Sequence, residues 1–334
     1  MAERDAQIAT FLAAAGWSSA KRRKLAGDAS FRRYERLSQQ GRRAVLMDAP
    51  PPEDVHPFLA VATILQRLGL SAPAILARDE AGGLLLLEDL GDDTYTRLLA
   101  EGADEAALYA LAVDVLIHLQ RRFDPLAAAL PPYDETRLLA EAALLVDWFL
   151  PAASLTQIPG DLRESYLAVW RRILPLAADA TPTLVLRDYH VDNLLVLPER
   201  SGVAACGLLD FQDAVIGPAS YDLVSLLEDA RRDVPRDLAA AMVERYLAAF
   251  PGLDRARFMA SYAILGAQRN CKIVGIFTRL WKRDGKPQYL DHIPRVWRLI
   301  EQDLCHPALA PIAEWLTRHI PPAHRSLASR RRIA

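Results

Sequence analysis

The chain has few cysteines, and their arrangement argues against two classes of protein. Only three of the 334 residues are cysteine, namely Cys206, Cys271 and Cys305, and they lie far apart. A scattered, odd set offers neither the spacing of a zinc site nor the paired framework of a small disulfide-bonded secreted domain. We therefore expect a protein of a reducing compartment, the cytoplasm.

Long apolar runs and charge of one sign are also missing. No segment approaches the roughly 20 apolar residues of a membrane span, and the first residues include acids where a signal peptide would be basic and then apolar. The formal net charge of -2 gives no field that would attract nucleic acid. Hydrophobic residues make up 51% of the chain, enough for the cores of two lobes. We expect a globular monomer with neither nucleic acid nor membrane as its partner.

Two common nucleotide-binding motifs are absent. The chain contains neither GxxxxGK[ST] nor GxGxxG, so a P-loop or a Rossmann site has no support. The turn Gly27-Asp-Ala-Ser-Phe-Arg-Arg-Tyr34 is the alternative, because small residues between two strands allow backbone N–H groups to approach phosphates. Ser30, Arg32 and Arg33 are its candidate nucleotide-binding residues, although only one of the two arginines can face the site, since neighbouring side chains on a strand alternate. An ordinary hairpin turn explains the segment equally well.

The pattern of apolar residues divides the chain into two parts. The first predicts four strands and two helices, namely strands 31–37, 43–47, 73–77 and 83–87 and helices 5–16 and 54–68. The second is mostly helical, with helices 104–122, 134–150, 161–178, 219–230, 236–249, 254–277 and 288–302. A catalytic hairpin with strands 184–186, 194–197 and 203–209 interrupts these helices. We predict an α+β, bilobal fold with a small antiparallel-sheet lobe (1–90) for the nucleotide and a larger helical lobe (91–334) for catalysis, metal and acceptor.

The chemistry is concentrated in Leu184-Val-Leu-Arg-Asp-Tyr-His-Val-Asp-Asn193 and Leu208-Leu-Asp-Phe-Gln212. Asp188 follows a predicted strand, Asn193 comes five residues later, and Asp210 ends another strand. Phosphoryl transfer in kinases uses this ordered set: a carboxylate that accepts the hydroxyl proton, then an amide and a carboxylate that hold Mg²⁺ against the ATP phosphates. We predict Asp188 as the base and Asn193 and Asp210 as metal ligands. Any one of them alone would be read as a turn residue.

Other side chains are candidates for ligand contact. Glu88 and Leu90 follow an apolar strand where backbone groups would bind a nucleotide base. Arg269 and Lys272, three residues apart, share one helix face that could line an acceptor pocket, and a solvated face is the plainer alternative. The remaining candidates for substrate contact are His190, Asp192 and Asp213. Asp222, at the start of a helix, is interpreted as a structural residue that braces the catalytic loop.

With these residues in view, the chain resembles the aminoglycoside phosphotransferase/choline kinase superfamily, whose fold is protein-kinase-like. The resemblance runs over roughly residues 8–310. Leu46-Met-Asp-Ala-Pro-Pro51, Leu87-Glu-Asp-Leu-Gly91, Arg187-Asp-Tyr-His190 and Asp210-Phe-Gln-Asp-Ala214, with the turn at 27–34, are similar to bacterial anomeric sugar kinases. These phosphorylate N-acetylmuramate and N-acetylglucosamine at C1 in peptidoglycan recycling, toward UDP-N-acetylmuramate. The resemblance implies a cytoplasmic transferase that uses ATP and Mg²⁺, with Asp188, Asn193 and Asp210 in the roles given above.

The chain departs from the family pattern at two places. The usual HxD motif reads Leu186-Arg-Asp188, and the usual lysine of the third strand is replaced by Met47. Glu53 is the one acidic residue near the start of the following helix, and Arg32 or Arg33 could supply the missing charge. Two alternatives stay open: a kinase of another hydroxyl compound, such as an aminoglycoside, choline or homoserine, and a nucleotide-binding pseudokinase.

Overall fold

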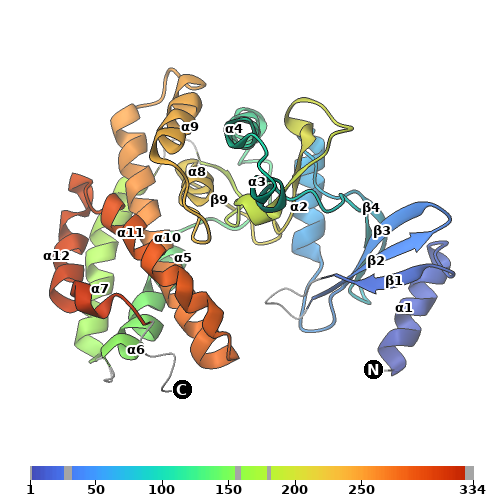
Figure 1. Cartoon of the computed structure of the whole chain (residues 1–334), viewed down its shortest axis with the longest axis horizontal. Coiled ribbons are helices and arrows are strands. Elements are labelled where there is room, and N and C mark those ends of the chain that lie inside the picture. Colours follow the sequence, from blue (N-terminus) through green and yellow to red (C-terminus); the bar gives the residue numbers. More distant parts are fainter. Residues whose placement is uncertain (1, 26–31, 155–158, 179–181, 328–334) are drawn as a thin grey trace. The chain divides into compact units, whose positions relative to one another are not determined.

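The structure is a computed structural model that describes residues 2–25, 32–154, 159–178 and 182–327 (Figure 1). It divides into two compact units. Unit 1 comprises Met1–Val115 and Val191–Ala214, and unit 2 comprises Leu116–His190 and Val215–Ala334. This division follows packing, whereas the lobes 1–90 and 91–334 are a division by role and stay a prediction. None of the described helices combines the length and the apolar character needed to cross a membrane.

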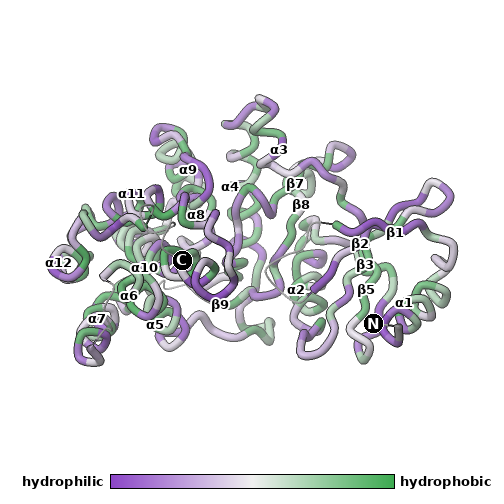
Figure 2. Tube along the Cα trace, turned by 60° about the horizontal axis from the view of Figure 1, so that its bottom comes forward, coloured by the Kyte–Doolittle hydropathy of each residue, from purple (hydrophilic) through white to green (hydrophobic). Residues whose placement is uncertain are grey.

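Unit 1 is built on a five-stranded antiparallel sheet with strand order β1-β2-β3-β5-β4. Its strands are β1 (Lys21–Lys24), β2 (Arg33–Gln39), β3 (Arg42–Asp48), β4 (Ile75–Asp79) and β5 (Leu84–Leu87). Its helices are α1 (Ala2–Ala14), α2 (His56–Arg67), α3 (Tyr95–Ala100) and the first part of α4 (Glu105–Arg122). The edge strand β1 is exposed at all four residues and stands out as hydrophilic in Figure 2. Charged side chains on an edge strand discourage pairing with another chain.

Alternation along the strands gives the sheet two different faces. Leu37, Ala44, Leu46, Leu84 and Leu86 form a buried core with Ile8 and Leu12 of α1. The opposite face carries Tyr34, Arg36, Val45 and Met47, because Arg36 pairs with Val45 and Tyr34 with Met47 in register. The β2–β3 turn uses Gln40 and Gly41, both at positive φ (50° and 77°), as tight hairpins require.

Unit 2 is mainly helical. Its helices are the end of α4, then α5 (Glu135–Leu144), α6 (Leu150–Ser154), α7 (Gly160–Ile173), α8 (Ser220–Leu227), α9 (Arg236–Ala248), α10 (Arg255–Asp284), α11 (Ile293–Asp303) and α12 (Ala310–His319). The central helix α10 begins at Asp254, whose side chain accepts the Arg257 N–H, and ends at Gly285 with φ 65°. A glycine at positive φ is a common helix stop. Most residues of α10 are buried, so it forms the centre of the unit's core.

The α+β architecture predicted from the sequence, an antiparallel sheet followed by a larger helical part, is confirmed. The predicted three-stranded hairpin is wrong in its pairing. Only β7 (Leu194–Val196) and β8 (Cys206–Leu208) pair with each other, whereas β6 (Thr183–Val185) pairs with β9 (Val215–Gly217), a strand that was not predicted. Residues 203–205 belong to a short 3₁₀ helix, Gly202–Ala205, rather than to a strand.

Other boundaries also differ from the prediction. α10 continues to Asp284, and the predicted helix 288–302 begins as a 3₁₀ turn, Pro287–His292, before α11. β1, α3 and α12 were not predicted, because short, charged or proline-flanked segments give little periodicity.

Gly275 lies where α10 comes closest to another backbone. A Cβ placed there would lie 2.3 Å from the backbone carbon of Leu144 in α5. We therefore expect Gly275→Ala to lower the free energy of unfolding by about 1–3 kcal/mol, because the helices would have to separate. Urea unfolding against the wild type measures this. Gly252→Ala is the matched control, since a Cβ there meets nothing within 4 Å; equal stability of the two variants would contradict the close approach.

Candidate active site

Unit 1 contains a cavity of about 320 Å³ between the sheet and the β7–β8 hairpin. Its walls are apolar, from residues of β3, β5, α2 and the hairpin: Val45, Leu87, Phe58, Leu195 and Leu209. Glu88–Gly91 border it on one side, and Asn193 and Asp210 lie in its lining. Apolar walls with a few polar groups and a volume of roughly 300–1,000 Å³ are typical of small-molecule sites.

The hairpin brings Asn193 and Asp210 to one place. Asn193 directly precedes β7, Asp210 comes two residues after β8, and the Leu209 N–H donates to the Asn193 carbonyl at 2.9 Å. Asp210 has φ 58°, a conformation that aspartate tolerates better than most residues. Gln212 donates to its Oδ1 at 2.7 Å, and Phe211 stacks on Phe58 of α2 with ring centroids 4.9 Å apart.

Asn193 and Asp210 suit Mg²⁺ better than they suit a metal whose ligands all come from the protein. One carboxylate and one amide oxygen are hard ligands, and Mg²⁺ keeps waters and phosphate oxygens in its remaining positions. Among the described residues no group of three or more His, Cys, Asp or Glu could hold a metal. The donor set therefore fits a metal that a nucleotide completes.

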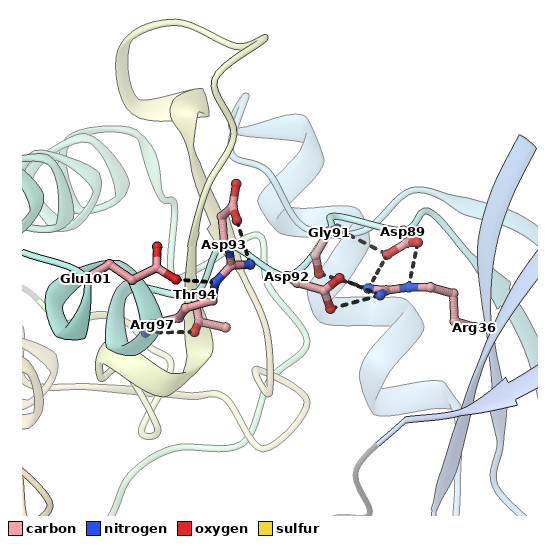
Figure 3. A network of polar contacts seen from close by, with 8 residues as sticks. All are labelled: Arg36, Asp89, Gly91, Asp92, Asp93, Thr94, Arg97 and Glu101. Carbon is pink, nitrogen blue, oxygen red and sulfur yellow. Dashed lines mark hydrogen bonds and ion pairs between the residues drawn. The ribbon is translucent and has the colours of Figure 1, made fainter. Parts of the chain in front are cut away.

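Arg36, which the sequence did not single out, fixes the segment along the cavity edge (Figure 3). Its Nε lies 2.8 Å from Asp89 Oδ2, and its Nη1 lies 2.6 Å from Asp92 Oδ2. Its Nη2 also donates to the Gly91 carbonyl at 3.1 Å. In the same figure Arg97 spans α3, with Nη1 3.1 Å from Asp93 before the helix and Nε 2.9 Å from Glu101 after its last residue. Neighbouring side chains on a strand point to opposite faces, a rule used above for Arg32 and Arg33. The same rule could have placed Arg36 on the cavity face.

The nucleotide candidates have different positions. Leu90 lines the cavity; Glu88 does too, but its carboxylate pairs with Arg200 and accepts the Ala74 N–H at 3.1 Å. Arg33 is exposed. Ser30 lies outside the described residues. Arg32 Nε lies 2.8 Å from Glu53 Oε2, with both side chains about 15% exposed or less.

Unit 2 contains a smaller pocket of about 130 Å³ that holds Asp188. His190, Arg269 and Lys272, all predicted to contact substrate, line it as well, and so does Arg231. Burial lowers the pKa of His190 and outweighs the carboxylates of Asp229 and Asp188, which raise it, so its ring is neutral near pH 7. Two predicted substrate residues line neither cavity: Asp192 accepts from Thr96, and Asp213 is exposed.

Asp188 follows a strained turn. The Asp188 N–H donates to the Leu186 carbonyl at 2.9 Å across Arg187, whose φ is 70°. Such tight turns are rare for residues other than glycine. The buried Asp222 holds this turn, because its carboxylate accepts the N–H groups of Leu186 (2.6 Å) and Arg187 (2.9 Å). These bonds confirm the interpretation of Asp222 as a brace for the loop.

Burial raises the pKa of Asp222 to about 7, against the two N–H bonds that favour its charged form.

Glu141 of α5 is a second brace that the sequence pattern did not indicate. Its carboxylate pairs with Arg187 and with Lys272 (3.1 Å), and it accepts the Tyr133 hydroxyl at 2.5 Å. Burial opposes its charge, but Lys272 and Arg187 outweigh burial and lower the pKa of Glu141. Burial alone would also lower the pKa of Lys272, but Tyr221 and Glu141 outweigh it and raise that pKa, so the ammonium stays charged.

Comparisons with known proteins agree with this arrangement. Residues 21–259 match the phosphotransferase enzyme family. An N-acetylmuramate/N-acetylglucosamine kinase of Caulobacter vibrioides is 41% identical, covering 96% of this chain and 97% of its own length. One of Pseudomonas aeruginosa with the same name is 38% identical over 93% of each chain.

Solved structures share the fold. A choline/ethanolamine kinase family protein from Mesorhizobium loti has a TM-score of 0.60 at 15% identity, covering 97% of this chain and 98% of its own. The streptomycin-ATP-APH(2")-IIa ternary complex has a TM-score of 0.56 at 16% identity, covering 82% and 90%.

The Arg32–Glu53 pair gives a test of what replaces the missing β3 lysine. We expect Arg32→Ala to raise the KM for ATP by about tenfold, the size of one lost charge-assisted contact, and Arg33→Ala to leave it near the wild-type value. Steady-state kinetics with ATP varied would show this. Two variants with the wild-type KM would rule out both arginines.

Glu141→Gln tests the second brace. Without the carboxylate, Arg187 and Lys272 lose their shared partner, so Asp188 is positioned less well. We expect kcat to fall by roughly tenfold, with either KM changed by less than about threefold. Glu135→Gln, at an exposed position of the same helix, is the control. A wild-type kcat for Glu141→Gln would contradict the bracing role.

The chain belongs to the phosphotransferase enzyme family and, within it, to the N-acetylmuramate/N-acetylglucosamine kinases.

Proposed function

We propose that this protein transfers the γ-phosphate of ATP to the anomeric C1 hydroxyl of N-acetylmuramate and N-acetylglucosamine, with Mg²⁺ as its metal. The observation that carries the proposal is the composition of the pocket around Asp188. Of the described residues that line it, Asp188 is the only acid, while Arg231, Arg269 and Lys272 are cations. The names of relatives at 41% and 38% identity support the same substrates.

The charge of this pocket also bears on the alternatives. Aminoglycosides and choline are cationic, so a site for them would present carboxylates rather than guanidinium and ammonium groups. A neutral or anionic sugar fits the cations better. The presence of Asp188, Asn193 and Asp210 together speaks against a pseudokinase.

The residues divide the reaction between them. Asp188 accepts the proton of the C1 hydroxyl as its oxygen attacks the γ-phosphorus, and a carboxylate suffices because an anomeric hydroxyl is more acidic than an ordinary alcohol. Asn193 and Asp210 would hold the metal, and the cavity beside them would take the adenosine part of ATP. Mg²⁺ would supply positive charge that offsets the charge of the phosphate oxygens. Lys272 keeps positive charge near Asp188, where the transferred group arrives.

The two sites bind different ligands, and only four residues of chain separate Asp188 from Asn193. Phosphoryl transfer requires the sugar and ATP to be bound at the same time. We infer that this short segment links the site of the base to the site of the metal. The same proposal places the enzyme in the cytoplasm, where its sugar 1-phosphate product would enter the recycling of cell-wall sugars toward UDP-N-acetylmuramate.

Asp188→Asn tests the assignment. We expect kcat with either sugar to fall by about 10²–10⁴-fold, the usual contribution of a general base, while ATP binding persists. In the wild-type reaction, ³¹P and ¹H NMR should show the phosphate on C1. Asp237→Asn, on the exposed first turn of α9, is the control. Phosphate on another carbon, or an active Asp188→Asn variant, would contradict the proposal.

A further inference from the structure

Two buried carboxyl groups of unit 2, here called the acid pair, meet outside the Asp188 pocket. Glu228 directly follows α8, and Asp303 is the last residue of α11. Their exposed fractions are 9% and 6%. The Nδ2 atom of Asn270 in α10 donates to both of them, at 2.7 Å to Glu228 Oε2 and at 3.2 Å to Asp303 Oδ2. One amide group of the central helix therefore ties the ends of two other helices together.

The acid pair packs closely against α10. A Cβ added to Gly266 would lie 2.7 Å from Asp303 Oδ1, so the missing side chain leaves room for this carboxyl group. On the same helix the Tyr262 hydroxyl is hydrogen-bonded to Glu228. Arg269 donates to the backbone carbonyl of Glu228 at 3.3 Å. The pair is thus surrounded by an amide, a hydroxyl and a guanidinium group of one helix.

These surroundings favour a proton on the acid pair. Burial raises the pKa of Glu228 to about 7, although Asn270 and Arg269 favour its charged form. Burial also raises the pKa of Asp303 well above its usual range, and the neighbouring charge of Glu228 raises it further. The two carboxyl groups are hydrogen-bonded to each other, which requires a proton on one of them.

Water can reach the acid pair through a cavity of about 880 Å³, which both acids line. Its lining includes other charged or titratable groups from the α8–α9 connection, α9, α10, α11 and the segment after α11: Asp229, Arg232, Asp233, Arg236, Tyr262, Arg295, Arg298, Cys305 and His306. Asp233 lies 3.0 Å from Arg295 and 3.1 Å from Arg298. Asp233 and Arg298 are exposed, so the cavity opens to solvent and gives the pair a route for proton exchange.

The acid pair also lies at the start of a segment that reaches the Asp188 pocket. Glu228 is followed by Asp229, Ala230 and Arg231, and the last two line that pocket. The Asp229 carboxylate accepts the Arg231 N–H at 2.7 Å, which holds the backbone in a bend. A shift of Glu228 would therefore move the wall of the pocket.

We propose that Glu228 and Asp303 share a proton at neutral pH, and that loss of this proton at alkaline pH loosens the bend after α8 and weakens sugar binding in the Asp188 pocket. Two neighbouring charges in a buried site repel each other, because little water screens them. The protonated pair joins α8 to α11, whereas the doubly charged pair pushes them apart. The effect on sugar binding rests on the proposed function.

The pH dependence of stability follows from the raised pKa values. In the unfolded chain both carboxyl groups lose their protons near their usual values of about 4, whereas the folded pair keeps a proton to higher pH. The contribution of the pair to stability is therefore fully present below about pH 4 and is lost as the pH rises through the raised values. Asp303→Asn keeps an N–H donor for Glu228 but cannot titrate. Between about pH 6 and pH 9 the urea midpoint of the wild type should fall relative to that of this variant.

Infrared spectroscopy of the whole protein tests the shared proton, because a protonated carboxyl group absorbs apart from a carboxylate. At pH 7 the wild type should show a larger protonated-carboxyl band than Asp303→Asn or Glu228→Gln. Asp222 contributes equally to all three spectra, so the difference belongs to the acid pair. Asp237→Asn, an exposed acid of α9, is the matched control and should keep the wild-type band.

Steady-state kinetics test the effect on the pocket. From pH 7 to pH 9 the KM for N-acetylglucosamine should rise about threefold or more in the wild type relative to Asp303→Asn, since a proton shift of one pKa unit corresponds to a factor of ten. Asp237→Asn should follow the wild type.

The possible results separate the parts of the proposal. Equal bands in the wild type and both variants would show that no proton is shared and would overturn it. A lost band with the same change of KM in the wild type and Asp303→Asn would overturn the link to the pocket. Absence of sugar turnover by the wild type at every pH would contradict the proposed function, while the infrared difference and the urea midpoints would still decide whether the proton is shared.

Discussion

The catalytic loop depends on one buried carboxylate. The turn from Leu186 to Asp188 puts Arg187 at φ 70°, which costs a residue with a side chain about 1–3 kcal/mol. Asp222, 3% exposed, offsets this cost by accepting two consecutive backbone N–H groups of the turn, and the Ser225 hydroxyl donates to the Arg187 carbonyl at 3.2 Å. These bonds hold the backbone that carries Asp188. Everything proposed about proton transfer rests on that position.

Both departures from the family pattern coincide with an arginine–glutamate pair. Where the third strand has Met47 instead of lysine, Arg32 pairs with Glu53. Where the loop has Leu186 instead of histidine, Arg187 pairs with Glu141. We infer that the first pair supplies the charge of the usual lysine and that the second pair braces the loop in place of the usual histidine. A guanidinium group is well suited to this, since it stays charged when partly buried and binds a carboxylate at two points.

The sequence predicted the residues whose roles depend on local order. Asp188 and Asp210 come shortly after strands and Asn193 directly precedes one, so their places could be read along the chain, and Asp222 could be recognised at a helix start. Glu141 and Arg231 could not, because each lies far from the catalytic loop in sequence and neither has a local pattern: Glu141 pairs with Arg187 and Lys272, and Arg231 lines the pocket. The pairing of β6 with β9 was missed for the same reason: three-residue strands give little periodicity, and their partners are chosen by packing. Ser30 falls outside the described residues, so its role stays a prediction, as do those of Asp192 and Asp213.

The central claim is that the C1 hydroxyl of an N-acetyl amino sugar is presented to Asp188 by a cationic pocket. A crystal structure of the protein with N-acetylmuramate, Mg²⁺ and a non-hydrolysable ATP analogue tests it most directly. The account predicts the C1 hydroxyl within about 2.6–3.2 Å of the Asp188 carboxylate, with the metal on Asn193 and Asp210. A sugar bound with its C6 hydroxyl at Asp188, or bound away from this pocket, would contradict it.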